Sequence, residues 1–145
     1  MNWEECKIKR LVKEVNLDVM LIKSLIEGSN NKLRTNELIP LTDMTASTKT
    51  GIAYDYLREI LEALALQKGF KIYNHECFTG FLKELLNLEE ESFEFDKFRK
   101  LRNGLNYYGK KITLEEAKSI INDMYKLKDK LYLIFGGEAK IKWAG

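Results

Sequence analysis

Apolar side chains recur every three or four positions along almost the whole chain, which is the period of an amphipathic α-helix. Strand-like alternation of apolar and polar residues is absent. The pattern predicts five helices, at residues 8–26, 44–67, 75–88, 92–108 and 114–135. The first helix is expected to end at the glycine- and asparagine-containing stretch 28–31, with a possible break near Asn16. Its apolar face comprises Ile8, Leu11, Val12, Val15, Val19, Ile22 and Ile26.

Residues that favour helix ends accompany the later boundaries. Asn74 and Ser92 precede the third and fourth helices and are expected to cap them. Thr113 and Glu116 have the spacing of a capping box at the start of the fifth helix, and the glycine pair 136–137 is expected to end it. Long helices joined by short connections are antiparallel neighbours. The sequence therefore predicts an all-α fold, an up-and-down bundle of about five helices.

Length and composition favour one folded unit. The 145 residues are 45% hydrophobic and 32% charged, which excludes a disordered chain. We expect a single domain at residues 1–137 and a short C-terminal tail at 138–145.

The longest apolar run is the five residues 131–135, against the roughly 20 that a membrane-spanning helix needs. The first five residues contain acids instead of the basic and apolar residues of a signal peptide, so we predict a cytoplasmic protein without membrane contact.

Cysteine and histidine content limits the possible chemistry. Cys6 and Cys77 are interpreted as reduced thiols of a cytosolic protein. With His75 as the single histidine, they cannot form a common four-ligand zinc site within one chain. Any mechanism that needs two histidines from one chain is also excluded. The sequence therefore predicts no metal and no cofactor.

Charge reverses sharply along the fourth predicted helix. Residues 84–96 contain six acids and no base, whereas residues 99–111 contain five bases and no acid. On a helical wheel, the apolar stripe of this helix separates from a polar flank. The stripe comprises Phe95, Phe98, Leu101, Leu105 and Tyr108, and the flank comprises Arg99, Arg102, Asn103 and Asn106. The planar guanidinium group suits phosphate binding, although arginines near a helix C-terminus also complement the helix dipole without any ligand.

Three segments resemble the HEPN family (higher eukaryotes and prokaryotes nucleotide-binding domain). Residues 98–109, FRKLRNGLNYYG, resemble its signature helix, and residues 47–69 and the YNHE sequence at 73–76 resemble its preceding elements. The likeness spans about residues 17–135. It implies a helical bundle, commonly dimeric. It also implies a relation to metal-independent ribonucleases, which are often toxins paired with a small nucleotidyltransferase antitoxin.

The resemblance assigns roles along the signature helix. Arg102 matches the motif arginine and Asn103 its polar follower. The motif histidine should follow Arg102 after four to six intervening residues, where the chain has Tyr107, Tyr108 and Gly109. A tyrosine with pKa ≈ 10 can donate a proton but is a poor base at neutral pH. The catalytic candidates are therefore Arg102 and Tyr107, in an impaired site.

The residues expected to bind nucleotide or RNA match the family motif better than the residues expected to be catalytic. Nucleotide or RNA contacts are assigned to Arg99, Arg102, Asn103, Asn106 and Tyr107. Asp55 and Arg58 of the second helix are second-rank candidates, since this helix can line the family's cleft; a solvated face with intrahelical ion pairs is the alternative. His75 could replace the missing base, but a capping contact beside Asn74 is favoured.

These observations leave three functional hypotheses. The first is a homodimer that binds nucleotide or RNA on a catalytically impaired ribonuclease scaffold. The second is an active ribonuclease toxin that uses tyrosine in place of histidine. The third is a protein-interaction module that pairs with a nucleotidyltransferase. The basic flank of the fourth helix favours the first two.

Overall fold

The computed structural model describes residues 1–107 and 111–138. Within them the chain is mainly helical, with six α-helices, one π-helical segment and a two-stranded sheet, so the predicted all-α class is confirmed. The elements are α1 (Trp3–Ile8), β1 (Val12–Glu14), α2 (Val19–Leu38), α3 (Ala46–Gln67), β2 (Phe70–Ile72), α4 (Cys77–Gly80), η1 (Phe81–Leu85), α5 (Glu89–Tyr107) and α6 (Leu114–Glu138).

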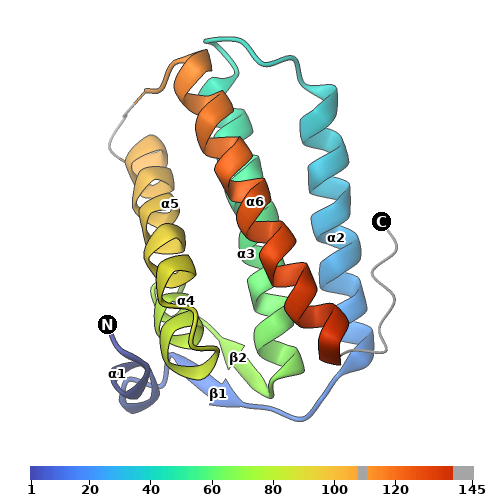
Figure 1. Ribbon diagram of the computed structural model, residues 1–145, viewed down its shortest axis with the longest axis vertical. Helices are drawn as coiled ribbons and strands as arrows, with labels where there is room; N and C mark the ends of the chain where they lie inside the picture. Colours follow the sequence, from blue (N-terminus) through green and yellow to red (C-terminus); the bar gives the residue numbers. More distant parts are fainter. Residues whose placement is uncertain (108–110, 139–145) are drawn as a thin grey trace.

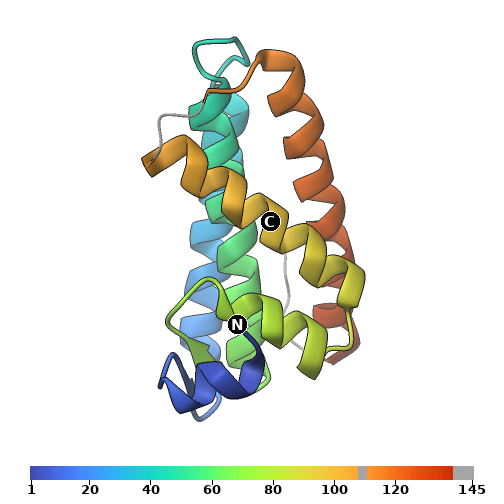
Figure 2. The ribbon, with the colours of Figure 1, turned by 90° about the vertical axis from the view of Figure 1, so that its left-hand side faces the viewer.

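Four long helices form the bundle, and successive ones run in opposite directions (Figure 1). Helix α3 is the central one and packs against α2, α5 and α6. Figure 2 shows that α5 is inclined across α3 instead of lying parallel to it. Because α3 is covered by three helices, apolar side chains are buried around most of its circumference. Its buried apolar residues include Ala53, Leu57, Ile60, Leu61 and Leu64.

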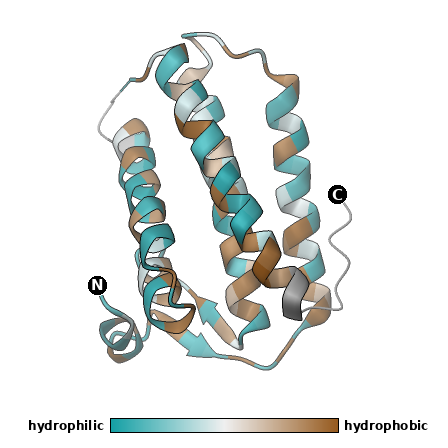
Figure 3. Cartoon of the chain, in the orientation of Figure 1, coloured by the Kyte–Doolittle hydropathy of each residue, from teal (hydrophilic) through white to brown (hydrophobic). Residues whose placement is uncertain are grey.

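The apolar side of each outer helix faces this central helix. Apolar and polar residues alternate around the long helices, as the colours of Figure 3 show. On α5, Phe95 and Phe98 are buried as the helical wheel predicts, while Leu101 and Leu105 pack against a smaller apolar cluster near the α5–α6 connection. No described helix is both long and apolar enough to cross a membrane.

The N-terminal region differs from the single helix predicted for residues 8–26. Helix α1 ends in a turn at Arg10, whose φ of 58° interrupts the helix. The chain then forms β1, which pairs antiparallel with β2, with Val12 opposite Ile72. Asp18 accepts a hydrogen bond from the Leu21 amide (3.0 Å) and starts α2. Three-residue strands are too short to produce a recognisable alternation, which is why the helical period was misleading here.

Helix ends were predicted with mixed success. Helix α2 continues through residues 28–31 to Leu38, because buried positions recur at Ser29 and Asn36. Ser92 is not an N-cap: α5 begins at Glu89, and the buried Ser92 hydroxyl donates to the Thr79 carbonyl (2.9 Å).

The third and fifth predicted helices also differ in part from the structure at their ends. The third is divided into α4 and η1, although Asn74 accepts from the Glu76 amide (2.8 Å) just before α4, near the predicted cap. The capping box of Thr113 and Glu116 is confirmed by reciprocal bonds of 3.1 and 3.2 Å. The glycine pair 136–137 does not end α6, which continues to Glu138; the rest of the predicted tail lies outside the described residues.

A disulfide joins Cys6 of α1 to Cys77 of α4, so the prediction of two reduced thiols is wrong. The two cysteines are 71 positions apart in the sequence, and nothing between them indicated that α1 folds back onto α4. The contact is close: the Trp3 ring lies 5.2 Å from that of Phe70, and a Cβ added to Gly80 would lie 2.9 Å from the Trp3 nitrogen. Helix α1 is therefore held by a covalent bond and by tight backbone packing.

Candidate functional site

Three arginines from two helices converge on the single histidine. We call Arg58 of α3 with Arg99 and Arg102 of α5 the arginine cluster; their side chains are 15–20% exposed. His75 lies in the connection between β2 and α4. Burial lowers the pKa of His75 to about 4, and the positive charges of all three arginines act in the same direction. The imidazole is therefore neutral at physiological pH.

Each arginine of the cluster has a carboxylate partner. Arg102 donates to Asp55 across the α3–α5 interface (3.3 Å), and Arg99 donates through two nitrogens to Asp96 one turn earlier (2.8 and 2.9 Å). Arg58 pairs with Glu62 of its own helix (3.0 Å). These carboxylates hold the guanidinium groups in place while they offset much of the positive charge. An incoming anion would have to compete with them.

Some donors of the cluster are left without an acceptor. The Nε atoms of Arg58 and Arg102 are buried and have no hydrogen-bond partner among the described residues. The Arg102 guanidinium also lies over the ring of Tyr54, 5.5 Å from its centroid. A buried donor without an acceptor is uncommon in folded proteins. The cluster therefore retains two donors that the described residues do not use.

Tyr54 engages one ring nitrogen of His75. Its hydroxyl lies 3.2 Å from His75 Nδ1, and burial of the ring raises the tyrosine pKa well above its usual value. The phenol therefore stays protonated, and the neutral imidazole either accepts a hydrogen bond from it at Nδ1 or donates an Nδ1–H to the hydroxyl oxygen, depending on the tautomer. In both cases Nδ1 is occupied by Tyr54, and Nε2 is the ring nitrogen left for a ligand.

The structure brings together residues that the sequence ranked separately. Asp55 and Arg58, the second-rank candidates, lie beside Arg102 of the signature helix through the Arg102–Asp55 ion pair. The alternative predicted a solvated α3 face with intrahelical ion pairs. Arg58 and Glu62 do form an i, i+4 pair, but their side chains are only 20% and 23% exposed. Asp55 pairs across helices instead.

The other candidates lie further along α5. Asn103 is half-buried and Asn106 is exposed. Tyr107 is the last residue of α5, and its side chain, like Tyr108 and Gly109, lies outside the described part of the structure. The geometry of the second catalytic candidate therefore stays a prediction.

Sequence reasoning favoured a capping role for His75, and the structure gives that role to its neighbour. Asn74 accepts the Glu76 amide, whereas the His75 ring contacts Tyr54 and lies 6.2 Å from the ring of Phe78. Tyr54, which precedes the candidate Asp55 in the sequence, is completely buried. The position of a tyrosine in a helix does not indicate which residue its hydroxyl group will contact in the folded protein.

The chemistry available is that of an anion site. Guanidinium groups are donors for phosphate oxygens. Among the described residues, no group of three or more histidine, cysteine, aspartate or glutamate side chains is arranged to hold a metal ion.

Comparison of the chain with protein-family models, with curated proteins and with solved structures finds no match. The resemblance to the HEPN family therefore rests on the residues quoted for it.

Proposed function

We propose that this protein binds RNA or nucleotide through the arginine cluster, on a HEPN-like scaffold whose ribonuclease activity is impaired. The carrying observation is that Arg58, Arg99 and Arg102 lie near enough to His75 for each to lower its pKa, with Arg102 over the ring of Tyr54, whose hydroxyl contacts His75. Guanidinium groups bind phosphate in a planar, bidentate manner. The two buried Nε atoms without acceptors support the same assignment.

Impaired catalysis follows from the state of His75. Metal-free RNA cleavage needs a base for the 2′-hydroxyl and an acid for the leaving oxygen. Nδ1 of His75 is engaged with the Tyr54 hydroxyl, so only Nε2 is left for proton transfer. The low pKa of the imidazole makes it a weak base at neutral pH. Arg102 would hold the phosphate, and the motif histidine that would move protons is missing.

A homodimer that buries α5 near its twofold axis is part of the proposal. Gly104 supports it, because a glycine inside a helix costs about 1 kcal/mol relative to alanine and permits close approach of a second helix. A nucleotidyltransferase is the partner that the family resemblance suggests. A cytoplasmic location is also proposed; the Cys6–Cys77 disulfide argues against it, because disulfides persist mainly in oxidising compartments. Sedimentation at tens of micromolar protein tests the dimer, and a monomer would contradict it.

The central experiment compares RNA affinity for three charge variants. Arg102→Ala should weaken binding of single-stranded RNA and reduce the salt slope by ~0.7 for the lost phosphate contact. Lys97→Ala is the matched control: it removes one positive charge from an exposed position of the same helix. Asp55→Asn should tighten binding, because it removes the carboxylate that competes for Arg102. Equal affinity of all three variants and the parent would refute the proposal.

The competing ribonuclease hypothesis is tested on the same RNA in EDTA. Impaired catalysis predicts little cleavage by the parent protein. Robust cleavage that is abolished by Tyr107→Phe would instead identify an active enzyme that uses tyrosine. Absence of RNA binding, together with capture of a nucleotidyltransferase encoded nearby, would favour the interaction module.

A further inference from the structure

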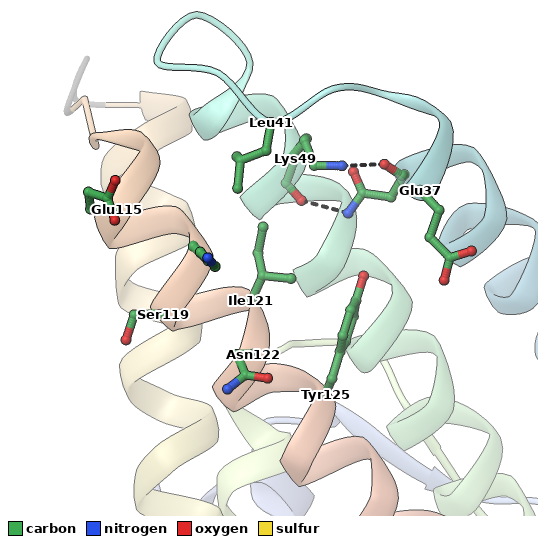
Figure 4. A pocket seen from close by; sticks show the side chains of 10 residues that line it. Glu37, Leu41, Lys49, Glu115, Ser119, Ile121, Asn122 and Tyr125 are labelled. Carbon is green, nitrogen blue, oxygen red and sulfur yellow. Dashed lines mark hydrogen bonds between the residues drawn. The ribbon is translucent and has the colours of Figure 1, made fainter.

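A pocket lies away from the arginine cluster, where the end of α2, the start of α3 and the first half of α6 meet (Figure 4). Its volume is about 670 Å³, within the range of pockets that hold small molecules. None of its lining residues belongs to the proposed RNA site. Two of them, Lys49 and Asn36, are polar and nearly completely buried, at 9% and 1% exposure.

Lys49 caps the end of α2 from the neighbouring helix. Its ammonium group donates to the carbonyl oxygens of Asn36 and, at 2.7 Å, of Ile39. These carbonyls belong to the C-terminal end of α2, which lacks intrahelical donors and carries the negative end of the helix dipole. The helix end thus balances the lysine charge, and no carboxylate among the described residues forms an ion pair with it. Two of its three protons are used, which leaves one donor.

Asn36 has a hydrogen-bond acceptor that is not used. Its Nδ2 donates to the Lys49 carbonyl (3.1 Å), but its Oδ1 is buried and has no hydrogen-bond donor among the described residues. A buried acceptor without a donor is costly, so native structures rarely contain one. Asn36 and Lys49, which contact each other in the pocket wall, therefore carry one unused acceptor and one unused donor.

The rest of the lining is partly apolar and partly polar. Leu41 and Ile121 point toward the cavity, and the ring of Tyr125 forms one side of it with its hydroxyl directed toward the Lys49 end (Figure 4). Glu37 and Glu115 line the rim, where their carboxyl groups are directed away from the cavity (Figure 4). The polar residues Lys118, Ser119 and Asn122 of α6 also line the pocket. A ligand would meet the apolar groups along its body, and Lys49 and Asn36 at one end.

We propose that this pocket binds a small molecule with an apolar body and an uncharged amide edge. The amide N–H would donate to Asn36 Oδ1, and the amide oxygen would accept the third proton of Lys49. A carboxylate lacks the donor and an ammonium group lacks the acceptor, so neither satisfies both residues. Because the end of α2 already balances the lysine charge, an anion gains less here than beside an isolated lysine. This site is independent of the proposed RNA binding.

The test uses three probes that share a phenyl body: benzamide, benzoate and benzylamine. Binding to the parent protein is followed by amide chemical shifts in NMR titrations up to millimolar probe concentrations, where fragments of this size bind. Benzamide should bind at least about ten-fold more tightly than the other two, with shifts at the residues of the pocket, because only benzamide pairs both unused groups. Equal affinities, or no benzamide binding at these concentrations, would overturn the proposal.

Two variants locate the binding. Ile121→Trp should fill the cavity and abolish the benzamide shifts, whereas Leu133→Trp adds the same ring at an exposed position of α6 and should leave them unchanged. Circular dichroism verifies that each variant is folded. Loss of binding in the Leu133 variant, or its persistence in a folded Ile121 variant, would place the ligand elsewhere and contradict the assignment. The comparison of probes on the parent protein stands even if a variant does not fold.

Discussion

Protonation of His75 is the most direct measure of the arginine cluster. The chain has one histidine, so a single imidazole signal in an NMR pH titration reports this site alone. We expect a pKa of about 4, well below the ordinary 6.5. Burial is the largest cause, followed by the charges of Arg58 and Arg102, with a smaller effect of Arg99; Asp55 acts in the opposite direction. Arg102→Ala should therefore raise this pKa.

The low pKa also predicts how stability changes with pH. A tenfold change in proton affinity corresponds to about 1.4 kcal/mol, so the drop in pKa from 6.5 to about 4 amounts to roughly 3 kcal/mol for a shielded group. His75 is partly exposed, and solvent screening reduces this to about 1–2 kcal/mol. The unfolded chain takes up the proton first. Stability from the neutral imidazole is therefore complete above pH 6.5, falls as pH decreases toward 4, and changes no further below it.

Urea denaturation of the parent and of His75→Gln at pH 7 and pH 4.5 isolates this contribution. The carboxylates titrate in both proteins. The difference between the pH dependences of their free energies of unfolding is therefore due to the histidine. Glutamine retains a group that can accept the Tyr54 hydroxyl bond. Phosphate or RNA bound at the cluster should raise the His75 pKa, because the anion offsets the arginine charges. A pKa at or above 6.5 in the free protein would refute the geometry of the cluster, and a pKa unmoved by RNA would place the RNA elsewhere.

Three further outcomes are expected. Replacement of both Cys6 and Cys77 by serine, or reduction of the parent, should lower the free energy of unfolding in urea by about 4 kcal/mol, the chain-entropy value for a loop of 71 residues. Gly80→Ala should destabilise the protein by about 1–3 kcal/mol because the added Cβ would collide with the α1 backbone. Gly51→Ala is the control in another helix: nothing lies within 4 Å of its added Cβ, so this variant should be stabilised by up to about 1 kcal/mol. Tyr107→His should increase metal-free RNA cleavage by roughly 10²-fold over the parent in EDTA, since an imidazole accepts and donates protons near pH 7; no increase would count against carrying the motif spacing over to this helix.

The long helices were predictable because their apolar periodicity extends over many turns. Helix α3 begins at Ala46 and ends at Gln67, close to the expected 44–67, and the capping box at Thr113 placed the start of α6. The N-terminal region was not predictable in this way. Its elements, α1 and β1, contain six and three residues, and a tertiary contact with β2 determines them instead of local period. The disulfide depends on that same contact.

The candidate site was predictable on one helix and not between helices. Charge patterning identified Arg99 and Arg102 on a flank of α5. Their surroundings could not be inferred, because nothing in the sequence states that α5 inclines across α3 and brings Arg102 to Asp55. The connection that holds His75 is likewise fixed by the β1–β2 pair, which the periodicity did not detect.

Helix α3 explains why both polar sites were difficult to recognise. Periodicity divides a helix into an apolar side and a polar side, and it assigns the polar side to solvent. It does not state how many neighbours cover the helix. Three helices cover α3, so its polar residues meet protein instead of water and must be paired there. Lys49 and Arg58 are nine residues apart, which places them on opposite sides of the helix at about 100° per residue. One pairs with the end of α2 and the other joins the arginine cluster. A central helix that carries buried charge on two sides is thus a physical reason to look for a binding site on each of them.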